Sequence, residues 1–175
     1  MRPQTLHDYI VFPTLQKMGS KYNTAAARQL VIATAAQESH CGAYFKQITG
    51  PALGIYQMEP PTVGDLFDNF LKPRKLEPLV MQFASPAGIE SPELISLLGE
   101  LFYATALARM NYWRRAGAHP AFDDFPAMWA YYKKYWNSYL GAATEKEFKA
   151  NWNKFVKPVD FSDPAQRVKP YTRVV

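Results

Sequence analysis

The feature that most constrains the fold is an uncharged run in the first quarter of the chain, Leu30-Val31-Ile32-Ala33-Thr34-Ala35-Ala36. A helix with this sequence is apolar on every side, and such a helix normally lies buried in the middle of a domain. Asn23 and Thr24 are both favourable N-cap residues, and Gly42 is a suitable residue to end the helix. We therefore expect a buried helix here, with the rest of the chain packed around it.

The remaining sequence is divided by capping residues, prolines and glycines into further helices. We expect them over residues 5–18, 62–71, 91–116, 124–140 and 144–157. Thr5 with Asp8 and Thr144 with Glu147 resemble capping boxes. Residues 42–61 are predicted to form a loop with a short hairpin, residues 72–90 an irregular proline-rich stretch, and the chain beyond Val159 an extended tail.

The length and composition fit one domain. The 175 residues are 48% hydrophobic, which suffices for a single core. We predict a single domain over 1–175 that is mainly α, or α+β at most, with the C-terminal helix and tail at 144–175.

Several classes of protein and site are not expected. No stretch approaches the roughly 18 apolar residues of a membrane span, and residues 1–8 contain no apolar signal segment. The single cysteine and three scattered histidines provide no disulfide and no metal site. We find no nucleotide-binding loop or serine nucleophile elbow, so no cofactor is expected.

The net charge of +5 suits an anionic partner, such as nucleic acid, a membrane surface or a bacterial wall. The basic residues are dispersed, however, and small groups such as Arg114-Arg115 are interpreted as solvated helix faces. A helical nucleic-acid-binding domain is an alternative, but it lacks a basic stripe or a recognisable motif. We expect no nucleic-acid partner.

Glu38 is the candidate for chemistry. It lies four residues after Thr34, in register with an apolar helix face, and in the last turn, where the helix dipole disfavours negative charge. Both features, together with partial burial, favour the protonated carboxyl. Glycosidic cleavage needs such an acid, because the leaving oxygen must receive a proton. The plain alternative is a surface glutamate that emerges into solvent as its helix ends.

Two motifs, in order, resemble those of the lytic transglycosylases of the lysozyme superfamily. The first is Glu38-Ser39, which resembles the catalytic Glu-Ser at a helix end. The second is Gly54-Ile55-Tyr56-Gln57-Met58-Glu59-Pro60-Pro61-Thr62, which resembles the family's Gly-Leu-Met-Gln motif and the apolar-x-Pro-x-Thr that follows it. Trp129-Ala130-Tyr131-Tyr132-Lys133 is similar to the third motif, Ala-Tyr-Asn-Ala-Gly, with Tyr132 in place of asparagine and no glycine. The resemblance covers about residues 24–140.

The resemblance implies a lysozyme-like fold with a substrate cleft, and an enzyme that cuts peptidoglycan between N-acetylmuramic acid and N-acetylglucosamine. Glu38 would be the catalytic acid and would then act as a base that closes the muramyl 6-hydroxyl into a 1,6-anhydro ring. The implied substrate-binding residues are Ser39, Tyr56, Gln57, Met58 and Tyr131, with the Tyr131 hydroxyl close to Glu38. The implied partner is the glycan strand. The sequence of the second motif resembles bacteriophage versions of these enzymes, which act on the wall from the virion or at lysis. Virion proteins are therefore further candidate partners.

Two alternatives keep the fold. A hydrolytic lysozyme would need a second carboxylate in the usual scheme, and Glu59 and Asp65 are the candidates. Glu59 also suits a plain loop residue, and Asp65 an acid in the first turn of a helix, which the dipole stabilises. We favour those plain interpretations, and with them a transglycosylase. The other alternative is a virion protein that binds the wall without cutting it, suggested by the departures at Tyr56 and Tyr132.

Overall fold

The uncharged run lies in a long buried helix, α3 (Ala25–Ser39). The structure, a computed structural model, describes residues 1–47, 49–84, 99–138 and 141–167. Thr24 caps α3, since its Oγ1 accepts a 3.1 Å hydrogen bond from the Ala27 amide. The helix ends two residues earlier than Gly42 would place it, because His40 already adopts the left-handed conformation (φ 49°).

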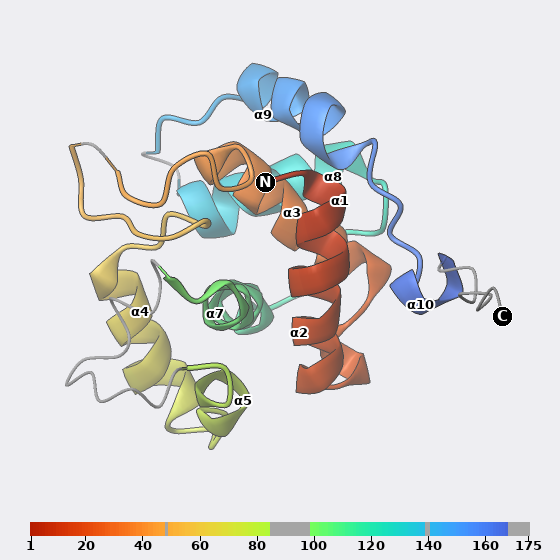
Figure 1. Ribbon diagram of the computed structural model, residues 1–175. Helices are drawn as coiled ribbons and strands as arrows, with labels where there is room; N and C mark the ends of the chain where they lie inside the picture. The colour runs from red at the N-terminus through yellow and green to blue at the C-terminus, as the bar shows by residue number, and fades with distance from the viewer. Residues whose placement is uncertain (48, 85–98, 139–140, 168–175) are drawn as a thin grey trace, which may run out of the picture.

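A second helix, α7 (Leu101–Trp113), is as deeply buried as α3. Every residue from Tyr103 to Tyr112 is buried. Figure 1 shows α7 end-on, between α2 on one side and α4 and α5 on the other. The Thr34 and Tyr112 hydroxyls, 2.7 Å apart, join α3 to α7. The core is therefore organised around two helices, where the sequence pointed to one.

The N-terminal helix is continuous from Pro3 to Met18 but changes its hydrogen bonding on the way. It is divided into α1 (Pro3–Leu6), the π-helical η1 (His7–Val11) and α2 (Phe12–Met18), followed by the short η2 (Ser20–Tyr22). Pro13 has no amide hydrogen to donate, and the π-helical turn directly precedes it. The capping box expected from Thr5 and Asp8 is wrong, because the helix begins two residues before Thr5.

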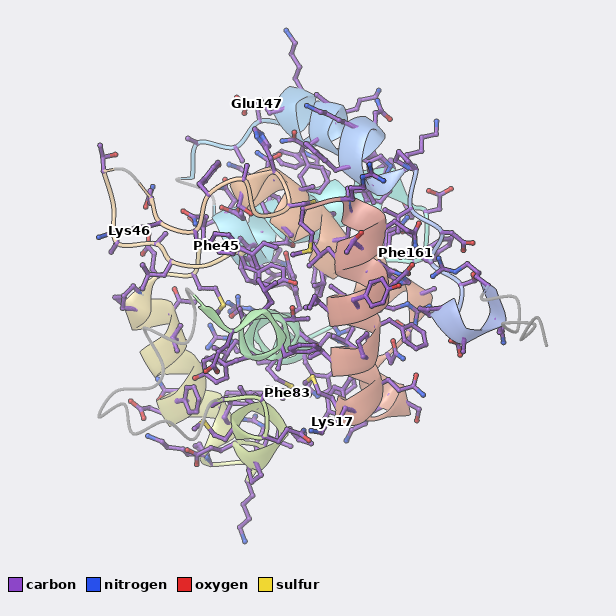
Figure 2. The ribbon with its side chains drawn as sticks, viewed as in Figure 1. Lys17, Phe45, Lys46, Phe83, Glu147 and Phe161 are labelled. Carbon is purple, nitrogen blue, oxygen red and sulfur yellow. The ribbon has the colours of Figure 1, made fainter. Side chains whose placement is uncertain are left out.

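The middle of the chain forms the other flank of α7. It contains α4 (Pro60–Leu66), continued by η3 (Phe67–Leu71), and the short α5 (Pro78–Met81). Lys17 of α2 lies over the ring of Phe83, 5.1 Å from its centroid, and joins the two flanks (Figure 2). The expected hairpin in the preceding loop consists of two isolated bridges, Lys46 with Leu53 and Leu53 with Met58.

The C-terminal part contributes α8 (Phe125–Tyr132) with η4 (Lys133–Asn137), α9 (Glu145–Asn151) with η5 (Trp152–Val156), and α10 (Pro164–Arg167). Asp124 caps α8, and the capping box of Thr144 and Glu147 is confirmed. Figure 1 shows α9 lying across α3. The tail is not wholly extended, because it turns into α10, and Phe161 packs edge-on against His7 at 5.1 Å.

The described residues thus form a mainly helical protein without extended strands, as expected. The helix start expected at Ser91 and the helix end expected at Leu140 lie outside the described residues. None of the helices in the described ranges is long and apolar enough to cross a membrane.

Candidate functional site

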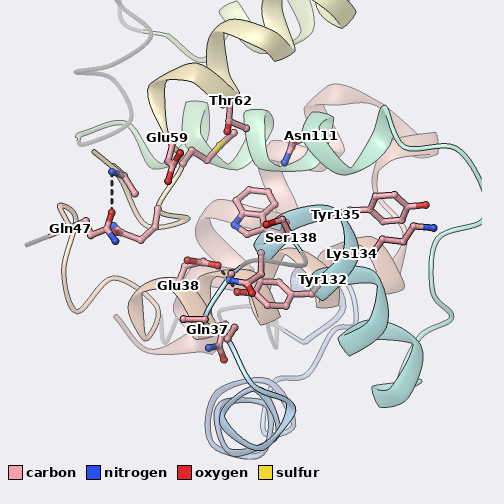
Figure 3. Close-up of a pocket in the computed structure, with 18 of the residues that line it drawn as sticks. Gln37, Glu38, Gln47, Glu59, Thr62, Asn111, Tyr132, Lys134, Tyr135 and Ser138 are labelled. Carbon is pink, nitrogen blue, oxygen red and sulfur yellow. Dashed lines mark hydrogen bonds between the residues drawn. The ribbon is translucent and has the colours of Figure 1, made fainter. Parts of the chain in front are cut away.

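A pocket of about 1190 Å³ opens where the end of α3 meets the loop that precedes α4. Its walls come from α3, the 52–59 loop, α4, the end of α7, η4 and α9, so segments far apart in the sequence share it. Figure 3 shows Glu38, Gln47 and Glu59 at one end, and Asn111, Lys134 and Tyr135 at the other. The two buried helices fix the position of this pocket, since each ends beside it.

Glu38 lines this pocket from the last turn of α3. Its Oε1 accepts a 2.6 Å hydrogen bond from the Tyr132 hydroxyl. Burial raises the pKa of the Glu38 carboxyl to about 7, while the hydrogen bond from Tyr132 acts in the opposite direction. A carboxyl with this pKa exists in both protonation states near neutral pH, as a group that first donates and then accepts a proton requires.

The hydroxyl that lies close to Glu38 belongs to Tyr132 and not, as expected, to Tyr131. Tyr131 points elsewhere: its hydroxyl donates to the Tyr112 carbonyl at 3.4 Å, and it lines a smaller hollow on α8. Adjacent residues on a helix diverge by about 100°, so only one of the two tyrosines can face Glu38. Placing Tyr131 beside Glu38 was wrong by one residue, and Tyr132, which stands in place of the third motif's asparagine, has that position.

Ser39 does not line the pocket and is fully buried. Its Oγ donates to the Ile55 carbonyl at 2.6 Å and accepts from the Gly42 amide at 2.9 Å. Ser39 therefore joins the end of α3 to the loop of the second motif. The expected direct contact with a sugar is replaced by a role in holding Glu38 and that loop in register.

Tyr56 is also a core residue rather than a wall of the pocket. It is 1% exposed, and its hydroxyl lies 2.8 Å from the Thr105 Oγ1 on α7. Its contribution to the cleft, expected from the second motif, is not seen. It anchors the loop to the central helix instead.

Gln57 and Met58 both line the pocket, as expected. Gln57 adopts a left-handed conformation (φ 47°), and its Nε2 donates to the Gly54 carbonyl at 2.7 Å. Gly54 itself has a positive φ of 75°, which suits glycine. The Met58 amide donates to the Leu53 carbonyl at 2.9 Å, which closes the turn. The motif therefore encodes a tight turn that presents Gln57 and Met58 across from Glu38.

Glu59 and Asp65, the two candidates for a second carboxylate, both line the pocket, but they differ in their hydrogen bonds. Asp65 pairs with Arg114 and accepts from Asn69, and these bonds lower its pKa. It lies in the second turn of α4 rather than the first, because the helix starts at Pro60. Glu59 precedes that helix, and its side chain makes no capping hydrogen bond.

The pocket also contains residues that the sequence did not single out. Trp136 lines it while packing on Tyr112, with the ring centroids 5.1 Å apart. Asn151 lines it from α9 and donates to Gln37 at 3.0 Å, which ties α9 to α3. The Arg114-Arg115 pair, interpreted above as a solvated face, lies in the wall as well. No local motif marks these positions, because the fold brings them together from separate helices.

Within the described ranges, no group of three or more His, Cys, Asp or Glu residues is arranged to hold a metal ion. Comparison with protein-family models, curated proteins and solved structures finds no match to this chain.

Proposed function

We propose that this protein cleaves the glycan strands of peptidoglycan as a lytic transglycosylase, with Glu38 as its acid and then its base. The observation that carries the proposal is the position of Glu38: a carboxyl with a pKa of about 7 at the end of a buried helix, in the wall of a large pocket. The alternative of a glutamate that merely emerges into solvent is disfavoured by the Tyr132 hydrogen bond and by the raised pKa.

The proposed reaction requires one carboxyl group. Protonated Glu38 gives its proton to the oxygen between N-acetylmuramic acid and N-acetylglucosamine, and the bond from that oxygen to the muramyl anomeric carbon breaks. The muramyl 6-hydroxyl then bonds to the anomeric carbon, and the Glu38 carboxylate takes its proton. The 1,6-anhydro ring forms without water, and Glu38 returns to its starting state.

In this scheme the neighbours of Glu38 have distinct tasks. Tyr132 is a positioning residue, since its hydroxyl fixes one carboxyl oxygen and leaves the other for the substrate. Gln57 and Met58 face the sugar from the opposite wall. The arrangement of acid, helix end and turn supports a lysozyme-like fold with a substrate cleft, which forms part of the proposal.

The pocket also keeps a second reaction open, because Glu59 lines it at the same end as Glu38 (Figure 3). A carboxylate there suits a base that activates water, which would make the protein a hydrolytic lysozyme. Asp65 is less suited, since it is already paired with Arg114.

Mass spectrometry of the fragments released from purified sacculi separates these reactions. We expect anhydro-muramyl ends, lighter than reducing ends by one water, and the Glu38→Gln variant should release none. Reducing ends would establish the hydrolase. Binding of wild-type protein to sacculi without any release would establish a wall-binding protein instead.

We further propose a bacteriophage setting, in which the protein acts on the wall from the virion or at lysis. The support is the resemblance of the second motif, and the test is to look for the protein in purified virions. Its presence supports a role in infection, with virion proteins as partners, while appearance only in late-infected cells supports lysis.

A further inference from the structure

The end of the pocket away from Glu38 is basic. Arg114, Arg115 and Lys134 all line it, on segments that meet beside Asn111 and Tyr135. Figure 3 shows Lys134 and Tyr135 at the end of the pocket opposite Glu38 and Glu59. The pocket therefore has acidic and basic ends.

The basic charge exceeds what the protein itself neutralises. Arg114 pairs with Asp65, but Arg115 donates only to the neutral Asn111 Oδ1 at 3.3 Å and the Tyr135 carbonyl at 3.4 Å. The Lys134 ammonium lies over the Tyr135 ring, 4.9 Å from its centroid. Among the residues that the structure describes, no carboxylate lies within ion-pair distance of Arg115 or Lys134.

The guanidinium of Arg115 is held at this site at a cost. Burial first, and then the neighbouring Arg114, lower the pKa of Arg115, which means that its surroundings disfavour the charge. The charge on Arg115 becomes less unfavourable when an anion binds between it and Lys134. Guanidinium groups bind carboxylates with two parallel hydrogen bonds, so a carboxylate suits the site.

We propose that this basic end binds a carboxylate of the peptide attached to the muramyl sugar. The inference rests on the proposed function, because it concerns the same pocket and the same substrate. In a peptidoglycan strand the peptides carry the carboxylates, whereas the linked N-acetyl sugars are otherwise neutral. A peptide carboxylate directed to Arg115 and Lys134 is also kept away from the Glu59 carboxylate, which would repel it.

The binding preference sets the orientation of the strand. A strand placed with its peptide at the basic end presents one particular glycosidic bond to Glu38, whereas the reverse placement sets like charges against each other. We therefore expect strands with free peptide carboxylates to be cut more efficiently than the same strands with those carboxylates converted to neutral amides. Loss of one charged hydrogen-bonding partner corresponds to roughly a tenfold change in the relative efficiency.

The test measures kcat/KM on two soluble substrates: peptide-bearing strands from sacculi without phosphate polymers, and the same strands after their peptide carboxylates have been converted to neutral amides. The ratio of the two values is compared for the wild type, Arg115→Gln and Lys134→Gln. Arg74→Gln is the matched control, because Arg74 is exposed, carries the same charge and lies outside the pocket. Lys134 is exposed, so its variant keeps the test decisive if Arg115→Gln fails to fold.

The expected result is a ratio well above one in the wild type, reduced about tenfold in Arg115→Gln and Lys134→Gln and unchanged in Arg74→Gln. An unchanged ratio in both pocket variants, or a wild type without preference, overturns the carboxylate site while leaving the proposed function intact. A wild type that cuts neither substrate overturns the proposed function, and the carboxylate site with it.

Discussion

The Tyr132 hydroxyl donates a 2.6 Å hydrogen bond to Oε1 of Glu38, across the junction between α8 and α3. The two residues are far apart in the sequence, and each is placed by a buried helix end. Burial raises the pKa of Glu38, and the hydrogen bond lowers it in part. The tyrosine therefore both orients the carboxyl and limits how far its pKa rises.

Replacing Tyr132 with phenylalanine tests this relationship. Because the hydrogen bond favours the charged carboxylate, its loss raises the Glu38 pKa above its value of about 7. Activity requires the protonated acid, so the wild-type kcat/KM should fall as the pH rises through about 7. In Tyr132→Phe this fall should move to higher pH, with kcat reduced about tenfold through poorer positioning. A pH profile of unchanged shape would contradict the role of Tyr132.

Glu38 should also destabilise the folded protein at neutral and alkaline pH. Its pKa is about 7 in the fold and near the ordinary 4.5 in the unfolded chain, so the folded state holds the proton more tightly. The free energy of unfolding therefore falls as the pH rises from about 4.5 to about 7, and it levels off above that value. Glu38→Gln retains an acceptor for Tyr132 and removes this effect.

We expect Glu38→Gln to be more stable than the wild type by up to about 3 kcal/mol above pH 7, and equally stable below about pH 4.5. Urea unfolding of both proteins at pH 4 and pH 8 measures the difference. A stability difference that does not depend on pH would show that the carboxyl is not desolvated.

Ser39→Ala should weaken the joint between α3 and the turn that carries Gln57. The substitution leaves the Ile55 carbonyl and the Gly42 amide without their partner in a buried place, which costs about 2 kcal/mol. Thermal unfolding measures the loss. The exposed Ser20→Ala is the control, and an effect of equal size there would argue against the joint.

Tyr56→Phe separates a core role from a substrate-binding role. Its hydroxyl pairs with Thr105 in the core, away from the pocket, so the variant should lose about 1 kcal/mol of stability and keep its KM. Tyr9→Phe, at a residue that is 71% exposed, should change neither quantity. A KM raised severalfold in Tyr56→Phe would indicate that Tyr56 contacts the substrate.

The sequence predicts the helices better than it predicts the residues of the pocket. The uncharged run and the caps at Thr24, Asp124 and Thr144 identify α3, α8 and α9, because local chemistry determines those starts. Glu38 could be singled out by the same local logic, from its register on an apolar face. The pocket position of Gln57 and Met58 follows from the turn that their motif encodes.

The errors have a common physical origin in the packing of one helix against another. The choice between Tyr131 and Tyr132 depends on the rotation of α8 relative to α3, which no local pattern reveals. Trp136 is apolar enough for the core and yet lines the pocket beside Tyr112. Arg115 has the sequence of a solvated face, and only the meeting of α7 with η4 places it in the wall.

The most direct test of the central claim compares wild type and Glu38→Gln in the release of soluble fragments from purified sacculi. Both proteins should be folded, with the variant no less stable at pH 7. We predict that the wild type releases fragments and that Glu38→Gln releases them at least about a thousandfold more slowly, since a general acid contributes about 10² to 10⁴ in rate and this one also acts as the base. Release by the folded variant at a rate close to that of the wild type would contradict the assignment of Glu38.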